Sequence, residues 1–156
     1  MYREELAQIA QTIWESVLRM ELEPVTADHA TKDSACLIAS IAFSGAWEGE
    51  VVATLGEALG RRLAGAMLDA EPEQLTREDM LDAVAEIVNM LGGNVKALLP
   101  PPCRLSLPRV ATSRTQLAPS VSEEVDEALY FSCQTLPIEI SLRATPSSRV
   151  ALDTST

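Results

Sequence analysis

Two polar residues one helical turn apart, Glu86 and Asn89, are the side chains in this sequence best placed to do chemistry. At about 100° per residue, Asp82, Glu86, Asn89 and Gly93 fall together on one side of a helix, and the apolar residues fall on the other. A carboxylate and a carboxamide at positions i and i+3 therefore project side by side, away from the core. The carboxamide offers a donor and an acceptor without a charge, whereas an exposed glutamate is a weak base at neutral pH.

The helix that must position this pair is predicted over residues 76–99. Thr76 is a natural N-cap, and the acids at 78 and 79 place negative charge in the first turn. The three prolines at 100–102 prevent the helix from continuing. The apolar stripe that has to be buried consists of Met80, Val84, Ile87, Leu91, Val95 and Leu98.

A glycine pair, Gly92 and Gly93, stands inside this helix, where each glycine costs about 1 kcal/mol relative to alanine. Two interpretations account for such a pair. Another segment of the same fold crosses close to the helix, or a partner approaches it at that point. The spacing alone favours internal packing and leaves the second interpretation open, and a Glu-x-x-Asn pair by itself is common by chance.

Composition limits the class of protein. The chain has 156 residues, 47% of them hydrophobic, and a formal net charge of −11, which argues against binding nucleic acid or an anionic membrane. Three cysteines without metal-like spacing are expected to be buried thiols, and the single histidine, His29, argues against a multi-His metal site or a catalytic triad. No stretch is long enough to span a membrane and no signal-peptide core is present, so we expect a cytoplasmic protein.

The remaining pattern predicts an α+β fold: a largely antiparallel sheet layered with two long helices and one shorter helix. Residues 1–143 are expected to form one domain, and 144–156 a frayed tail. Proline 108 places its strand at an edge or a strand end. The predicted elements are helix 3–22, ended by Pro24; a hairpin of strands 35–43 and 50–55; helix 57–68; the long helix; strand 103–112; a polar loop 114–127; and strands 129–135 and 138–143.

The segment DAVAEIVNMLGGNVK, residues 82–96, resembles the Glu-x-x-Asn helix of the CheC/CheX phosphatases of bacterial chemotaxis. Residues 39–51 and 59–68 resemble the hairpin and helix that precede this motif in the family. Residues 105–108, Leu-Ser-Leu-Pro, resemble the Ser-x-Pro segment that follows it, although no glycine follows here. Only one copy of the motif is present, which is similar to CheX and differs from CheC, which has two.

The resemblance implies a protein phosphatase that hydrolyses the phosphoaspartate of a CheY-like response-regulator receiver. Asn89 would position the attacking water, and Glu86 would contact a lysine in the receiver's active site. Gly93 would let the helix backbone lie close to the partner, and Asp82 and Lys96 could add contacts, although each also fits a solvated surface charge. The chain would need no cofactor of its own, because the receiver supplies the Mg²⁺.

The resemblance also implies a homodimer with a continuous sheet, and an exposed edge is expected near residues 137–143. Two alternatives to an enzyme remain open at this stage. In the first, the same helix binds a receiver or another signalling domain without catalysis. In the second, the chain is a structural subunit of a larger assembly that uses its sheet edge, and the motif is idle.

Overall fold

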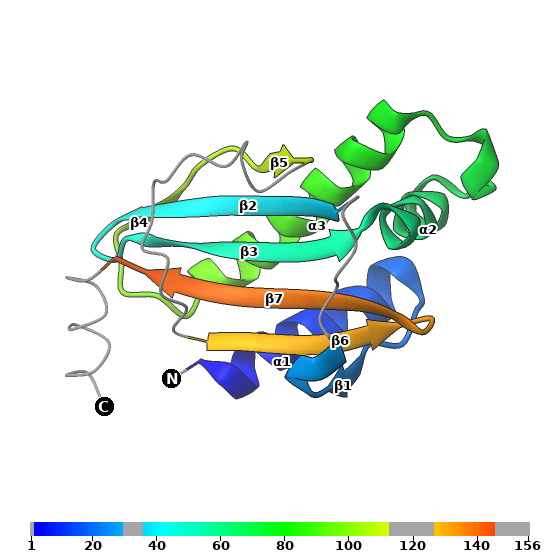
Figure 1. Ribbon diagram of the computed structural model, residues 1–156. Coiled ribbons are helices and arrows are strands. Elements are labelled where there is room, and N and C mark those ends of the chain that lie inside the picture. Colours follow the sequence, from blue (N-terminus) through cyan, green and yellow to red (C-terminus); the bar gives the residue numbers. More distant parts are fainter. Residues whose placement is uncertain (1, 30–35, 113–126, 146–156) are drawn as a thin grey trace.

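The apolar run predicted as a buried strand forms β2 (Cys36–Gly45), which pairs with β3 (Gly49–Gly56) in the predicted hairpin. Both strands belong to a computed structural model that describes residues 2–29, 36–112 and 127–145. The other strands are β1 (Glu23–Val25), β4 (Cys103–Leu105), β5 (Arg109–Ala111), β6 (Glu127–Cys133) and β7 (Leu136–Ala144). All pairings are antiparallel, in the order β1-β6-β7-β3-β2-β4, and β5 also pairs with β2 (Figure 1).

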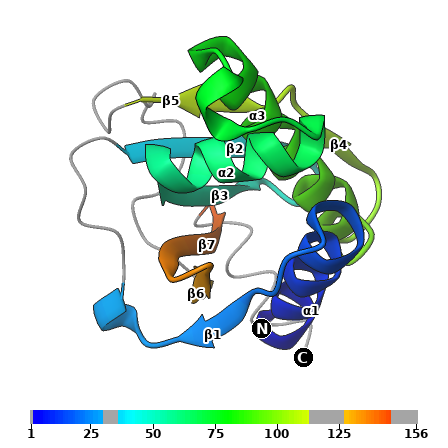
Figure 2. The same ribbon diagram turned by 90° about the vertical axis from the view of Figure 1, so that its right-hand side faces the viewer.

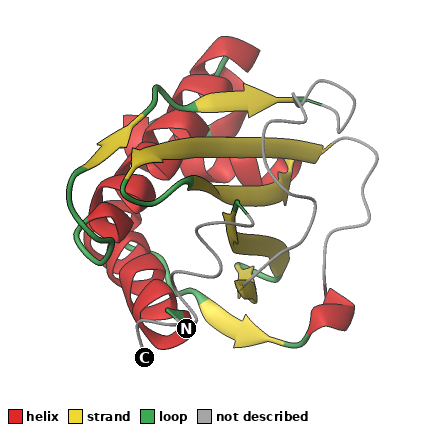
Figure 3. Cartoon of the chain, turned by 90° about the vertical axis from the view of Figure 1, so that its left-hand side faces the viewer, coloured by secondary structure: helices red, strands yellow, loops and turns green. Residues whose placement is uncertain are grey.

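Three α-helices, α1 (Arg3–Ile13), α2 (Glu57–Leu68) and α3 (Arg77–Lys96), lie on one face of this sheet (Figures 2 and 3). Short 3₁₀ turns occupy Ala27–His29 and Pro72–Gln74. Alternation along β3 buries Val51, Ala53 and Leu55 in the core cluster that also contains residues of all three helices. The fold is therefore α+β, as predicted. Within the described ranges, no helix has the length and apolar character needed to cross a membrane.

Helix α3 forms for the reasons that the sequence suggested. Thr76 is its N-cap, and a complete capping box joins Thr76 to Asp79: each backbone N–H donates to the other residue's side chain over 3.0 Å. The predicted stripe from Met80 to Val95 is buried, although Leu98 lies beyond the helix and is only half-buried. An ion pair of 2.6 Å between Arg77 Nη1 and Glu57 Oε1 links the starts of α2 and α3.

The prediction of one helix over residues 3–22 is wrong at its C-terminal end. α1 passes into a π-helical turn at Trp14–Leu18, and Arg19 then adopts a left-handed conformation with φ of 55°. The turn buries Trp14 and Leu18 together, and the backbone N–H of Arg19 donates to the carbonyl of Trp14. The chain then extends into β1, which contains Pro24 and was not predicted, so the sheet has one long helix and two shorter ones above it.

The edge expected near residues 137–143 is also wrong. β7 lies inside the sheet, where β6 and β3 pair with its two sides, so its backbone is not available to a second subunit. The homodimer itself stays a prediction. The predicted polar loop 114–127 and the predicted frayed tail 144–156 lie outside the described residues, except that Glu127 begins β6 and residues 144–145 are described.

Candidate functional site on helix α3

The face of α3 that points away from the sheet carries the predicted residues, and we call Asp82, Glu86, Asn89 and Gly93 the α3 ridge. Asp82, Glu86 and Gly93 are exposed, as predicted, whereas Asn89 is half-buried. The opposite face of the helix is fully packed, with Val84, Val88 and Leu91 among the buried residues. The core stripe therefore fixes the rotation of α3 and holds the ridge toward solvent.

The polar side chains of the ridge are uncommitted within the described part of the chain. The side chains of Glu86, Asn89 and Asp82 form no hydrogen bond or ion pair with any described residue. A second asparagine on the helix behaves differently, since Asn94 Nδ2 donates to the carbonyl of Met90 over 2.8 Å. The Asn89 side-chain amide is thus unbonded within the described residues, whereas Asn94 uses its amide on its own helix.

The structure shows internal packing at one residue of the glycine pair and not at the other. A Cβ on Gly92 would lie 2.6 Å from Ile41 Cγ2 and 3.4 Å from Leu105 Cδ2, so Gly92 lets α3 pack closely on the sheet. A Cβ on Gly93 would meet no atom of the described residues within 4 Å. Packing inside the fold therefore explains Gly92 and does not explain Gly93.

Lys96 is exposed at the end of α3, two turns beyond Asn89. Burial raises the pKa of the Cys103 thiol, and the positive charge of Lys96 acts against this shift. No hydrogen bond or ion pair among the described residues joins Lys96 to Glu86. The predicted contact of Lys96 with a partner stays a prediction. Asp82, in contrast, lies one turn before Glu86, and both side chains line one hollow on the surface.

That hollow lies between α2 and α3 and has a volume of about 270 Å³. Its lining combines the apolar Met67, Leu68 and Ala83 with three acids, Asp79, Asp82 and Glu86. Leu68 is the last residue of α2 and remains 52% exposed. The sequence pattern did not single out Leu68, because its position opposite the ridge depends on how α2 and α3 pack.

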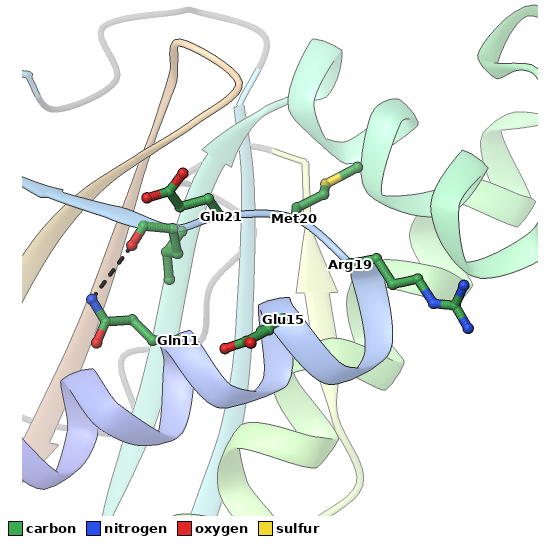
Figure 4. A pocket seen from close by; sticks show the side chains of 6 residues that line it. Gln11, Glu15, Arg19, Met20 and Glu21 are labelled. Carbon is green, nitrogen blue, oxygen red and sulfur yellow. Dashed lines mark hydrogen bonds between the residues drawn. The ribbon is translucent and has the colours of Figure 1, made fainter.

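A second hollow, of about 670 Å³, lies beneath the segment that links α1 to β1 (Figure 4). Its lining includes Gln11, whose Nε2 donates to the carbonyl of Leu22 over 3.4 Å, and the charged residues Glu15, Arg19 and Glu21. The side chain of Arg19 points away from both glutamates (Figure 4). This hollow exists because the chain breaks at Arg19, which the prediction of a continuous helix did not foresee. It shares no residue with the α3 ridge.

The other chemically reactive residues do not form a site. Cys36, Cys103 and Cys133 are all buried free thiols, as predicted. His29 is exposed and lies beside Asp28, with 3.5 Å between Nδ1 and Oδ1. Among the described residues, no three His, Cys, Asp or Glu side chains are grouped so that they could hold a metal ion. The α3 ridge is thus the candidate site.

Comparison with solved structures shows the same fold in several chemotaxis proteins. The chain is similar to the chemotaxis protein CheX of Vibrio vulnificus, with 20% identity, a TM-score of 0.72 and 90% and 94% of the two chains covered. It is similar to a chain of the CheX–CheY–BeF₃–Mg²⁺ complex of Borrelia burgdorferi, with 16% identity, a TM-score of 0.67 and coverage of 91% and 96%. Thermotoga maritima FliY also shares the fold, with 18% identity, a TM-score of 0.56 and coverage of 92% and 88%.

The sequence itself carries a family signature. No curated protein matches the chain. The family model described as chemotaxis phosphatase CheX, however, matches residues 37–131. That match extends from β2 through the whole of α3 into β6, so it includes the hairpin, the α3 ridge and the hollow beside it. The chain therefore belongs to the chemotaxis phosphatase CheX family.

Proposed function

We propose that this chain dephosphorylates the phosphoaspartate of a CheY-like response-regulator receiver. The observation that supports this proposal is the α3 ridge, where an exposed Glu86 and an uncommitted Asn89 stand one turn apart beside an open glycine. A convex helix face of this kind suits entry into another protein's active site, because no other described part of the chain occupies it. The family to which the chain belongs is described as a phosphatase.

Asn89 is assigned to the attacking water. Hydrolysis of an acyl phosphate needs a water in line with the carboxylate that leaves, and little covalent chemistry is required of the protein beyond that orientation. A carboxamide accepts a hydrogen bond from the water through its oxygen and donates one from its nitrogen. Because the Asn89 amide has no partner among the described residues, it loses no internal bond when it takes this role.

Glu86 is assigned to a lysine in the receiver's active site. Its carboxylate is exposed and unpaired in the described residues, so it remains free to bind an external ammonium group. Once the interface excludes water, such a pair fixes the register of α3 on the receiver. A register error of about 1 Å would displace Asn89 from the water, which gives Glu86 a positioning role as well as an affinity role.

The metal ion of this reaction is assigned to the receiver as part of the same proposal. A divalent cation neutralises the charge that develops on the transferred phosphoryl group. The ridge offers two carboxylates, those of Asp82 and Glu86, on a helix surface, whereas a resident Mg²⁺ needs octahedral oxygen coordination. The chain contributes water orientation and docking, and the receiver contributes the phosphoaspartate and its cation.

The test is the lifetime of the phosphate on a receiver. A CheY-like receiver from the same organism is phosphorylated with acetyl phosphate and Mg²⁺, the donor is removed, and phosphate loss is followed with and without the chain. We expect the chain to accelerate the loss at concentrations well below that of the receiver, as a catalyst does. If no receiver of that organism loses phosphate faster at any concentration of the chain, the proposed function is wrong.

The half-burial of Asn89 favours a second candidate function, namely binding of the receiver without catalysis. A partly covered amide has less freedom to enter a phosphorylated pocket than an exposed one. In that case, the chain would bind a receiver loaded with BeF₃⁻, a stable substitute for the phosphoryl group, and the phosphate lifetime would stay unchanged. The two readouts together separate the candidates.

The glycine pair provides a prediction in which two adjacent substitutions have opposite effects. Gly92→Ala should lower the free energy of unfolding by about 1–3 kcal/mol, since the new methyl group would overlap Ile41. Gly93→Ala should leave stability unchanged or raise it by up to about 1 kcal/mol, because alanine favours a helix. Yet Gly93→Ala should weaken binding of the BeF₃⁻-loaded receiver, because the methyl group would hold the backbone of α3 away from the backbone of the receiver.

Urea denaturation measures the first pair of effects, and titration of the receiver measures the last. Each variant serves as the other's control, because both add one methyl group to the same helix. Unchanged receiver affinity in Gly93→Ala would remove the argument for close approach at that position.

A further inference from the structure

The hollow between α2 and α3 has a feature that hydrolysis of a phosphoaspartate does not require. Leu68 is 52% exposed at its rim, and Met67 beside it is half-buried. Leaving a leucine half in water costs free energy that burial in an interface would recover. The hollow also adjoins Glu86 directly, so any protein that docks on the α3 ridge must lie over it or beside it.

The charge on the hollow has one sign. Asp79, Asp82 and Glu86 supply three carboxylates to the lining, and no lysine or arginine of the described residues lines it. Asp79 already accepts a hydrogen bond from the backbone of Thr76, but neither Asp82 nor Glu86 has an internal partner among the described residues. A docked partner would desolvate these carboxylates, which is unfavourable unless the partner brings a positive charge.

The walls of the hollow are held in place before any partner binds. Gly60 lets α2 pack closely on both β2 and α3, because an added Cβ would lie 2.8 Å from Leu37 Cδ1 and 3.3 Å from Met80 Cγ. The Arg77–Glu57 ion pair ties the start of α3 to α2. A hydrogen bond of 3.3 Å from Arg61 Nη1 to the carbonyl of Leu75 ties the connecting segment to α2. A preformed hollow loses little conformational entropy on binding, which suits a recognition site.

We propose that this hollow takes one long basic side chain, lysine or arginine, from the surface of the receiver outside its active site. The aliphatic stem would lie on Met67, Leu68 and Ala83, and the cationic end would reach Asp82 at the rim. This inference rests on the proposed function, and it adds a contact that selects among receivers. Receivers with a basic residue at the matching position are bound, and receivers without one are discriminated against.

The test separates affinity from turnover in three variants. Leu68→Ser removes the apolar support, Asp82→Asn removes the charge, and Val17→Ser is the matched control, because Val17 is also an exposed apolar residue, at 40%, but lies outside α2 and α3. We expect Leu68→Ser to raise KM and the Kd for the BeF₃⁻-loaded receiver about tenfold, with kcat unchanged. Asp82→Asn should raise both several-fold and weaken their dependence on salt. Val17→Ser should match the wild type.

The outcomes are distinct from those that test the phosphatase proposal. If the wild type shows no activity and no binding with any receiver, the proposed function fails and this contact fails with it. If the wild type is active but Leu68→Ser keeps the wild-type KM and Kd, the hollow is not part of the interface and only this inference is wrong. If Asp82→Asn raises KM and Kd but Leu68→Ser does not, the charge acts through long-range steering. That result also overturns the proposal that the hollow binds a basic side chain. The occupant can be identified by a charge swap. The Asp82→Lys variant is combined with receivers in which one basic residue is changed to glutamate, and the receiver variant that restores binding carries the occupant.

Discussion

Replacement of Asn89 by alanine should lower kcat for phosphoreceiver hydrolysis by about 100-fold or more, with a change of less than about threefold in the Kd for the BeF₃⁻-loaded receiver. The expected loss follows from the chemistry of the reaction. Without the carboxamide, the water inside the interface has no group on this chain to hold it in line with the departing carboxylate. The receiver's own slow hydrolysis would remain.

The control for this substitution is on the same helix. Asn94→Ala removes the same group from an exposed position five residues later, where the amide is bonded to the carbonyl of Met90. That variant should retain wild-type kcat. A third variant, Asn89→Asp, tests the uncharged character of the side chain, because a carboxylate beside a phosphoryl group adds repulsion and offers no donor. It should be at least as inactive as Asn89→Ala.

Stability measurements guard against an indirect explanation. Asn89 has no internal bond among the described residues, so its truncation should change the free energy of unfolding by less than about 0.5 kcal/mol. Full activity of Asn89→Ala would refute the water-positioning role. If Kd rises in parallel with the fall in kcat, Asn89 is instead assigned to docking. The binding-only candidate would then gain support.

The parts of the fold that the sequence predicted are those fixed by local chemistry. The capping box at Thr76, the apolar stripe of α3 and the proline stop define the helix without reference to any other segment. α2 occupies its predicted residues, 57–68, because it too is an amphipathic segment between two clear boundaries. The outward direction of Glu86 follows from the same helical period, which explains why the candidate site could be located before its surroundings were known.

The parts that could not be predicted depend on contacts between distant segments. The apolar period of the first helix continues past Leu18, yet the chain turns at Arg19, because burial of Trp14 and Leu18 in the shared core decides where the helix ends. The pairing of β3 with β7 joins segments on opposite sides of α2 and α3 in the sequence, so no local pattern places β7 inside the sheet. The hollow beside Leu68 arises in the same way, from the packing of two helices.

Reversal of the charge at residue 86 is the second large effect that we expect. Glu86→Lys should raise the Kd for the BeF₃⁻-loaded receiver at least about 30-fold, since loss of one partner of a buried charge pair costs at least about 2 kcal/mol. Two ammonium groups would then face each other in a water-poor interface, so Glu86→Lys should lose more affinity for the receiver than Glu86→Gln does. With the helix register lost, kcat measured at saturating receiver should fall as well.

A control variant with the same change in net charge shows whether this result is specific to the site. Glu15→Lys makes the same change to the overall charge of −11 at an exposed position on the π-helical turn, outside the α3 ridge. It should alter the rate of association at low salt and leave the Kd at physiological salt near that of the wild type. Equal losses in both variants would mean that the receiver senses only the overall field of the chain. A loss confined to Glu86→Lys, reversed when the receiver's active-site lysine is changed to glutamate, would place that carboxylate and that lysine in direct contact.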